Sequence, residues 1–244
     1  REEMRGLGTI VNVAAVIVGG GLGMFLKEGL KTRYQEILMQ ALGAATIFIG
    51  AAGALKEIFS VAGGNLRTGG TMMLIFSLVL GALAGEWINI ERWMERFGIW
   101  IKGKVKGKDD PEFVEGFVTT SLVICVGAMA IVGALQDGLT GDASMLFSKA
   151  VLDGVLVLVF ASTLGKGAIF SAIPVGILQG SITVFAGGLA PILTEQTISN
   201  LSLVGSVLIF CVGVNLAFDK KLRVGNMLPA LVFAVIYSLI PFKI

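Results

Sequence analysis

The sequence contains no histidine and only two cysteines, and these shortages narrow the chemistry that the chain can perform. Without histidine, a Ser-His catalytic arrangement or a thiol–imidazole metal site is unsupported. Cys125 and Cys211 both lie inside apolar runs, so we interpret them as small buried side chains rather than a disulfide framework. The sequence also has no phosphate-binding loop and no metal-ligand cluster. We therefore expect neither an enzyme nor a bound cofactor or metal.

Charged residues are scarce as well, at 15% of 244 residues, against about a quarter in an average soluble domain. Hydrophobic residues make up 55%, and the mean hydropathy is +0.87. The formal net charge is only +2, so nucleic acid is not expected as a partner. The 34 glycines suit helices that pack closely in a membrane. This composition predicts that the partner around the chain is a lipid bilayer.

Apolar runs long enough to cross a bilayer recur from one end of the chain to the other. A spanning helix needs roughly 20 mostly apolar residues. The sequence predicts an all-α, polytopic transmembrane bundle that forms a single membrane domain over residues 1–244. The eight predicted spans cover residues 8–26, 37–54, 70–88, 117–135, 145–163, 168–193, 201–218 and 227–242.

Lysine and arginine are divided unevenly between the two sides that eight spans would define. The odd-numbered connections carry 13 of them, whereas the other side, with Lys149 and both termini included, carries six. Because positive charge concentrates in cytoplasmic loops, we expect the basic loops in the cytoplasm and both termini outside.

Residues 89–110 form the only long polar stretch between two predicted spans. Apolar residues recur there at helical spacing, with basic residues on the other side and with Trp93 and Trp100 among them. A basic amphipathic helix with tryptophans suits the surface of an anionic membrane. The alternative is a docking helix for a cytoplasmic partner.

Three small-residue-rich stretches, residues 39–57, 119–138 and 201–220, share a pattern in which each ends in a polar cluster. The pattern predicts that the third to fifth spans resemble the sixth to eighth. A unit with an odd number of spans must re-enter from the opposite side, which gives the inverted repeat common in secondary transporters. The alternative is that glycine-rich membrane helices all look alike.

Lys149 and Asp153 are the most informative polar residues, since they lie four residues apart within a predicted span and share one helix face. Charges at membrane depth face protein or a wet cavity. The pair could neutralise itself structurally, or it could bind an ionic substrate or relay protons. Gln179 lies near mid-membrane in a span weakened by Pro174 and glycines. It could face a solute from a discontinuous helix, or belong to a kinked, tightly packed interior helix.

Other candidates lie near the ends of the predicted spans. Gln136 and Asp137 form an outer cap, where Asp137 could concentrate cations at a mouth or cap free backbone amides. Glu115 opens the fourth span, where the helix dipole favours negative charge. Ser121 follows in the same span, where a hydroxyl often bonds its own helix.

Several segments resemble one known family: GLGTIVNVAAVIVGGGLG at the start, EGFVTTSLVICVGAMAIVGALQDGLTGD followed by KAVLDG, then PVGILQG and VGNMLPAL. The chain is similar over essentially its whole length to the YdfK/YqgA-like bacterial membrane proteins, domain-of-unknown-function family 554. This resemblance implies a multi-pass protein of the bacterial inner membrane and no established substrate. It singles out Glu115, Ser121, Gln136, Asp137, Lys149, Asp153, Gln179, Asn226 and Pro229.

Two functions follow from these observations. The first is a transporter of a small solute or ion, with a polar site between the fourth, fifth and sixth spans at Lys149, Asp153, Gln179 and Ser121. The second is a non-transporting scaffold or signalling module that recruits partners through residues 89–110. A homo-oligomer is compatible with either function.

Overall fold

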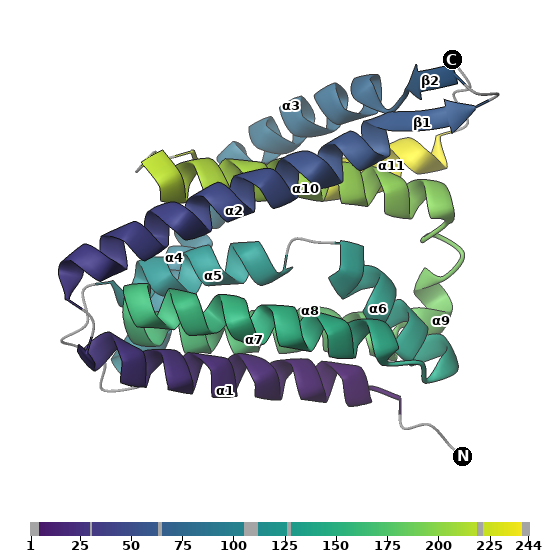
Figure 1. Ribbon diagram of the computed structural model, residues 1–244. Helices are drawn as coiled ribbons and strands as arrows, with labels where there is room; N and C mark the ends of the chain where they lie inside the picture. Colours follow the sequence, from purple (N-terminus) through teal and green to yellow (C-terminus); the bar gives the residue numbers. More distant parts are fainter. Residues whose placement is uncertain are drawn as a thin grey trace.

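The computed structural model describes residues 5–29, 31–62, 65–104, 112–125, 128–218 and 222–240, and it is a helical bundle with one short antiparallel hairpin (Figure 1). In chain order the elements are α1 (Leu7–Gly29), α2 (Thr32–Ile58), β1 (Phe59–Ala62), β2 (Asn65–Thr68), α3 (Thr71–Ile88), α4 (Ile90–Lys104), α5 (Phe113–Cys125), α6 (Ala128–Thr140), α7 (Ser144–Leu164), the 3-10 helix η1 (Gly165–Ser171), α8 (Ala172–Val184), α9 (Ala186–Leu189), α10 (Glu195–Phe218), the 3-10 helix η2 (Val224–Met227) and α11 (Pro229–Leu239).

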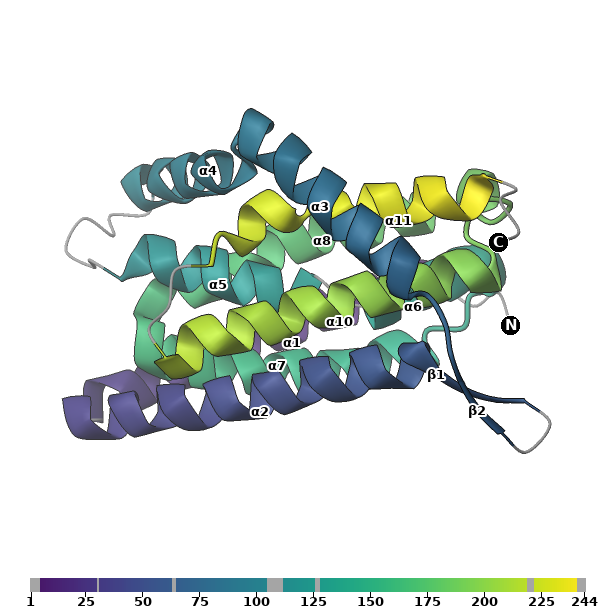
Figure 2. The same ribbon diagram turned by 90° about the horizontal axis from the view of Figure 1, so that it is seen from above.

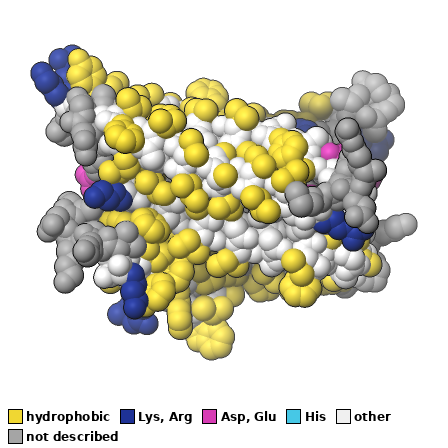
Figure 3. Space-filling view, turned by 90° about the horizontal axis from the view of Figure 1, so that it is seen from below, with side chains coloured by type: hydrophobic (Ala, Val, Ile, Leu, Met, Phe, Trp, Pro, Cys, Tyr) yellow, Lys and Arg dark blue, Asp and Glu magenta, His cyan; other side chains and the backbone are white. Residues whose placement is uncertain are grey.

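Most of the long helices lie roughly along a common direction, whereas α3 crosses them obliquely, and α1 begins at the same end of the bundle at which α11 ends (Figures 1 and 2). We call this end the terminal end. The opposite end carries α4, the start of α5, and η1 and η2; we call it the basic end because its described positive residues are Lys31, Arg33, Arg92, Arg96, Lys102, Lys104, Lys166 and Arg223. Hydrophobic side chains form a broad band between the two ends (Figure 3).

Five described helical segments are long and apolar enough to cross a membrane, or six if the bent pair α5–α6 counts as one span. The predicted number of eight is therefore not confirmed, and neither is the inverted repeat. One of the five segments covers 41 residues, from Ser144 to Val184. A straight helix of that length would measure about 60 Å, twice the hydrocarbon thickness. The chain instead turns at Gly165, whose φ of 80° ends α7.

Glycine brings α1 and α7 into close parallel contact. A Cβ atom at Gly19 would lie 2.2 Å from the carbonyl oxygen of Gly154, and one at Gly23 would lie 2.2 Å from that of Leu158. Both contacts advance by four residues in the same direction, so the two helices run parallel. This is the small-residue packing that GxxxG spacing favours in membranes.

Close contacts at glycine also join α3 to α11, and these two helices run antiparallel. A Cβ at Gly81 would meet the backbone of Ala230, and one at Gly85 would lie 1.8 Å from the carbonyl oxygen of Asn226. Pro229 is the first residue of α11, a position whose missing N–H costs the helix nothing. The backbone of η2 and the start of α11 is therefore held directly against α3.

Between α2 and α3 the structure contains the hairpin that an all-α prediction omits. Phe59 pairs with Thr68 and Ala62 pairs with Asn65. Strands of four residues are too short for the alternation of apolar and polar residues to stand out from neighbouring helices. The hairpin lies at the terminal end, outside the helical bundle (Figure 2).

Candidate functional site

Lys149 and Asp153 lie one turn apart on α7, and both face the interior of the bundle. Less than a tenth of either residue is exposed. The Nζ of Lys149 donates to both carboxylate oxygens of Asp153, at 2.7 Å to Oδ1 and 2.6 Å to Oδ2. Removing two charges from water is costly, and this arrangement offsets the cost with short, charge-assisted hydrogen bonds.

Lys149 also holds a backbone carbonyl where two helices meet at an angle. α5 ends at Cys125, α6 begins at Ala128, and the two helices are bent by 62°. Nζ donates to the carbonyl oxygen of Ile124 at 2.9 Å, in the last turn of α5, where helical carbonyls lack a partner in their own helix. The span predicted over residues 117–135 is thus formed by two helices with a bend between them rather than by one straight helix. An ammonium group faces the negative end of the α5 dipole instead.

Two amide side chains complete the group. The Nδ2 of Asn12 in α1 donates to Oδ2 of Asp153 at 3.0 Å and to Oε1 of Gln179 in α8 at 3.2 Å. Asn12 and Gln179 are both almost fully buried. We call Asn12, the Ile124 carbonyl, Lys149, Asp153 and Gln179 the polar cluster; it joins α1, α5, α7 and α8 (Figure 1).

The structure thus brings three of the candidates, Lys149, Asp153 and Gln179, into one buried group. Sequence reasoning missed Asn12, although it is a lone amide in the apolar run that forms α1. The interpretation of a discontinuous helix at Gln179 is wrong. Pro174 lies in the first turn of α8, where a proline is tolerated, and α8 continues unbroken past Gln179.

The remaining interior candidates lie outside the polar cluster, and two of them, Asp137 and Ser121, form hydrogen bonds elsewhere in the bundle. Asp137 is fully buried and caps α1, because its Oδ1 accepts the Gly6 N–H at 2.9 Å and its Oδ2 accepts the Gly8 N–H at 3.0 Å. Gln136 is half-buried beside it on α6. The hydroxyl of Ser121 donates to the Phe117 carbonyl at 2.6 Å within its own helix. Of the two interpretations of Asp137, the geometry favours the amide cap.

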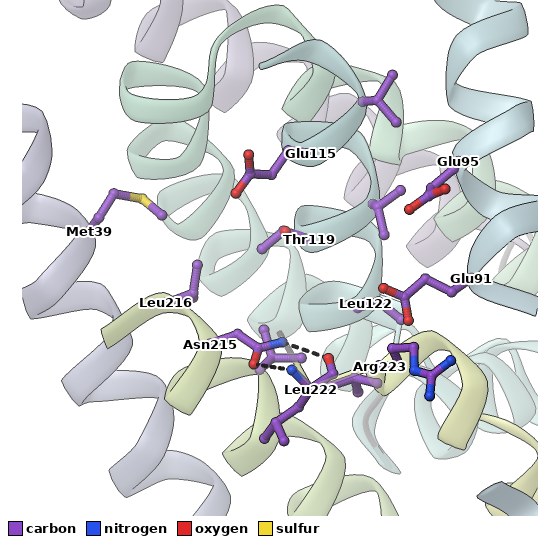
Figure 4. A pocket seen from close by; sticks show the side chains of 14 residues that line it. Met39, Glu91, Glu95, Glu115, Thr119, Leu122, Asn215, Leu216, Leu222 and Arg223 are labelled. Carbon is purple, nitrogen blue, oxygen red and sulfur yellow. Dashed lines mark hydrogen bonds between the residues drawn. The ribbon is translucent and has the colours of Figure 1, made fainter. Parts of the chain in front are cut away.

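Glu115 lines a separate cavity of about 790 Å³ at the basic end, between α2, α4, α5 and α10. Glu115 and Thr119 extend from α5, with Glu91 and Glu95 of α4 opposite them (Figure 4). The remaining walls are mostly apolar. A concave, largely apolar chamber with a few polar groups is the usual form of a small-molecule pocket. Because Glu115 lines this cavity, it lies outside the polar cluster.

The acidic rim of this cavity is linked to α3. Burial raises the pKa of Glu91, nearby Glu95 adds to the effect, and Arg223 opposes it. Oδ1 of Asn226 accepts the backbone N–H of Glu91 at 2.8 Å, and Nδ2 of Asn226 donates to Glu86 Oε2 at 2.8 Å. Glu86 also pairs with Arg223. Asn226 thus joins α3, α4 and η2 at the edge of the cavity.

The amphipathic helix predicted within residues 89–110 is present as α4 over Ile90–Lys104, and residues 105–110 lie outside the described ones. Gly98 and Ile101 are buried, whereas Trp93 and Trp100 are more than half exposed. Asn89 adopts a φ of 58° between α3 and α4, a left-handed turn that asparagine tolerates better than most residues.

Within the described residues, no three His, Cys, Asp or Glu side chains are grouped closely enough to hold a metal ion. Cys125 and Cys211 are free thiols of intermediate burial.

The similarity of this chain to known proteins extends over nearly its whole length. The model of the family described as "Protein of unknown function (DUF554)" matches residues 7–239. The chain is 32% identical over 224 residues to "Uncharacterized membrane protein YdfK" of Bacillus subtilis (strain 168), with 92% of each chain covered. It is 28% identical over 233 residues to "Uncharacterized protein YqgA" of Escherichia coli (strain K12), with 94% of each covered. No solved structure matches it. The sequence resemblance is thereby confirmed: the chain belongs to the DUF554 family and has a relative named as a membrane protein.

Proposed function

We propose that this protein carries a small polar solute or ion across the bacterial inner membrane. The observation that supports the proposal most is the bonding of Lys149 to both Asp153 and the Ile124 carbonyl at the bend between α5 and α6. Ionisable residues at membrane depth usually mark a solute, ion or proton pathway. Broken helices whose ends face a charged group are the common architecture of binding sites in secondary transporters.

The arrangement of cavities supports the same proposal. One cavity, of about 790 Å³, lies at the basic end, and another, of about 570 Å³, lies between the start of α1, the end of α6 and α8–α9 at the terminal end. Of the helices that form the polar cluster, α1, α7 and α8 run between these two ends, and α5 runs from the basic end to the bend (Figure 1). Alternating access requires that a buried site be reached from each side in turn, and the two cavities supply an opening at each end of the bundle.

The orientation follows from the distribution of charge. Eight of the described lysine and arginine residues lie at the basic end, whereas Arg5, Lys56 and Arg67 lie at the terminal end. The positive-inside tendency then assigns the basic end to the cytoplasm, and the Glu115 cavity becomes the cytoplasmic chamber. Glu115, Glu91 and Glu95 would give this chamber a negative potential that concentrates cationic species at its mouth.

Purified protein in liposomes tests the proposal. The assay follows uptake of amino acids, small neutral solutes, Na⁺, K⁺ and protons by the wild type and by Asp153→Asn, with Asp142→Asn as control. Asp142 is an exposed carboxylate just before the same helix, so the control removes an equal charge. We expect at least one flux that Asp153→Asn abolishes and Asp142→Asn preserves. If every flux matches that of protein-free liposomes, the proposal fails.

The second candidate function is a non-transporting module that recruits a partner through α4. The observation in its favour is the exposure of Trp93 and Trp100 on a helix whose opposite side packs on α5. The same two side chains would suit a membrane interface equally well. Replacing both with serine leaves buried Ile101 in place. If this double variant no longer captures a partner, in an assay that does not depend on transport, and still binds vesicles as the wild type does, the second function is favoured over a membrane anchor.

A further inference from the structure

We propose that the transported solute is a small neutral or zwitterionic molecule that carries both a hydrogen-bond donor and an acceptor, and that it enters between α1 and α8 at the terminal end. This inference rests on the proposed function and names its substrate class. It is based on the pocket at that end and on three buried atoms behind it that lack a hydrogen-bond partner.

The pocket at the terminal end is a space of about 570 Å³ between helices that diverge. Its lining includes Arg5 just before α1, Thr9 of α1, Gly138 of α6, and Gly180, Thr183 and Gly187 of α8–α9. Deeper in the bundle α1 and α8 touch, since a Cβ at Gly176 would lie 3.3 Å from Val13. Nearer the end they separate, and a Cβ at Gly180 or Gly187 would meet nothing within 4 Å. The gap therefore widens toward the terminal end.

Three orphaned polar atoms lie between this pocket and the ion pair. They are Oγ1 of Thr9, Oδ1 of Asn12 and Nε2 of Gln179, each buried and without a hydrogen-bond partner in the described structure. Thr9 itself lines the pocket and is 8% exposed. Asn12 lies one turn deeper on α1, and Gln179 directly precedes Gly180 on α8. Most buried polar atoms in proteins have a hydrogen-bond partner, so three unpaired ones in succession indicate a place that a ligand completes.

The charge balance of the cluster selects the kind of ligand. Lys149 donates to three oxygens and both oxygens of Asp153 accept, so the pair is satisfied and has no net charge. The groups without a partner are the Oδ1 acceptor of Asn12, the Nε2 amide donor of Gln179 and the hydroxyl of Thr9. A metal cation would meet one amide oxygen, one hydroxyl oxygen and a repelling donor, still far fewer oxygens than its coordination requires. A solute with its own donor and acceptor pairs with all three groups.

The three atoms are enclosed in this conformation, so the solute reaches them only when the pocket deepens between α1 and α8. Gly180 lies where such deepening must begin, and a larger residue fits there without a backbone clash. Gly188, on α9, also has nothing within 4 Å of its Cβ position, yet it does not line the pocket. The two glycines therefore make a matched pair for substitution.

The test compares proteoliposomes containing wild type, Gly180→Leu, Gly188→Leu and Gln179→Met. The probes are urea, glycerol and glycine, followed by vesicle swelling, and Na⁺, K⁺ and Cl⁻, followed by ion-sensitive dyes. We expect uptake of at least one of the first three probes and of none of the ions. Gly180→Leu should slow that uptake by at least about tenfold, since one extra methylene in a pocket already costs 10- to 200-fold, whereas Gly188→Leu should not slow it.

Gln179→Met provides a second variant in case Gly180→Leu fails to fold. It removes the free donor from this buried position without adding a charge, so uptake of the neutral probe should also fall about tenfold or more. Ion flux that depends on Asp153, or uptake unaffected by both Gly180→Leu and Gln179→Met, would overturn this inference while leaving a transporter. The absence of any flux would overturn the inference and the proposed function together.

Discussion

Removing either partner of the Lys149–Asp153 pair should destabilise the protein far more than removing both. In Lys149→Met, the Asp153 carboxylate loses the ammonium 2.6 Å from Oδ2 and keeps one hydrogen bond from Asn12. The Ile124 carbonyl loses its 2.9 Å donor at the same time. Breaking a buried ion pair typically costs about 3–5 kcal/mol, because an uncompensated charge remains. Asp153→Leu leaves Lys149 as the uncompensated charge, and the expected cost is similar.

The double variant Lys149→Met/Asp153→Leu removes both charges and fills the space with apolar side chains. Replacing a buried pair with hydrophobic residues of similar volume is often neutral. Allowing about 1–2 kcal/mol for the orphaned Ile124 carbonyl and Asn12 amide, the double variant should lose much less than the sum of the two single variants. The expected coupling energy is then several kcal/mol.

Reversible unfolding of the detergent-solubilised protein measures all four states of this cycle. Lys104→Met serves as a control, since Lys104 is an exposed lysine on α4; its effect should stay within about 0.5 kcal/mol. Single variants that each cost less than about 1 kcal/mol, or that add without coupling, would show that the charges are solvated or separate in the native protein. The geometry of the polar cluster would then be wrong.

Three further perturbations test other parts of the structure. Asp137→Ala should cost about 1–2 kcal/mol and speed hydrogen exchange at the amides of Gly6 and Gly8, because it removes a charged cap from α1; unchanged exchange there would contradict the cap. Gly85→Ala should cost about 1–3 kcal/mol by thermal unfolding, since its Cβ would lie 1.8 Å from the Asn226 carbonyl oxygen, whereas Gly21→Ala, with nothing within 4 Å, should be neutral or stabilising. The raised pKa of Glu91 means that the folded protein binds this proton more tightly than the unfolded chain, so the associated stability is full below the ordinary pKa of 4.5 and is lost as pH rises toward the folded value. Melting temperatures of wild type and Glu91→Gln across this range should diverge, with only the wild type falling; parallel curves would refute the assignment.

The features that were predictable from sequence are those encoded by composition and spacing within one helix. The run that became α1 is apolar and continuous, and its GxxxG spacing at Gly19 and Gly23 does mark a close helix contact. Lys149 and Asp153 share a helix face because four residues complete about one turn, whatever the rest of the fold does. Local periodicity therefore identified the ion pair before any neighbour was known.

The features that sequence reasoning missed depend on contacts between distant segments. The run 117–135 contains no charged residue and no proline, so the sequence predicts one span there without the bend between α5 and α6; its Ile124 carbonyl is held by a lysine 25 residues away. Asn12 looks like an isolated polar residue until α7 and α8 bring Asp153 and Gln179 beside it. Pro174 led us to consider a break at Gln179 that the structure does not contain. A proline breaks a helix interior but is tolerated in a first turn, and the sequence does not show where α8 begins.

The hydrogen bonds of the polar cluster connect four helices in series, so each group is positioned by the next. The Ile124 carbonyl at the bend needs a donor, which Lys149 supplies, and Lys149 at this depth needs the counter-charge of Asp153. Asp153 in turn orients Asn12, and Asn12 orients Gln179. The network ends at the free Oδ1 of Asn12 and the free Nε2 of Gln179, next to the pocket between α1 and α8. A solute bound to these two atoms would polarise the amides of Asn12 and Gln179, and through Asp153 and Lys149 the effect would extend to the Ile124 carbonyl at the bend between α5 and α6.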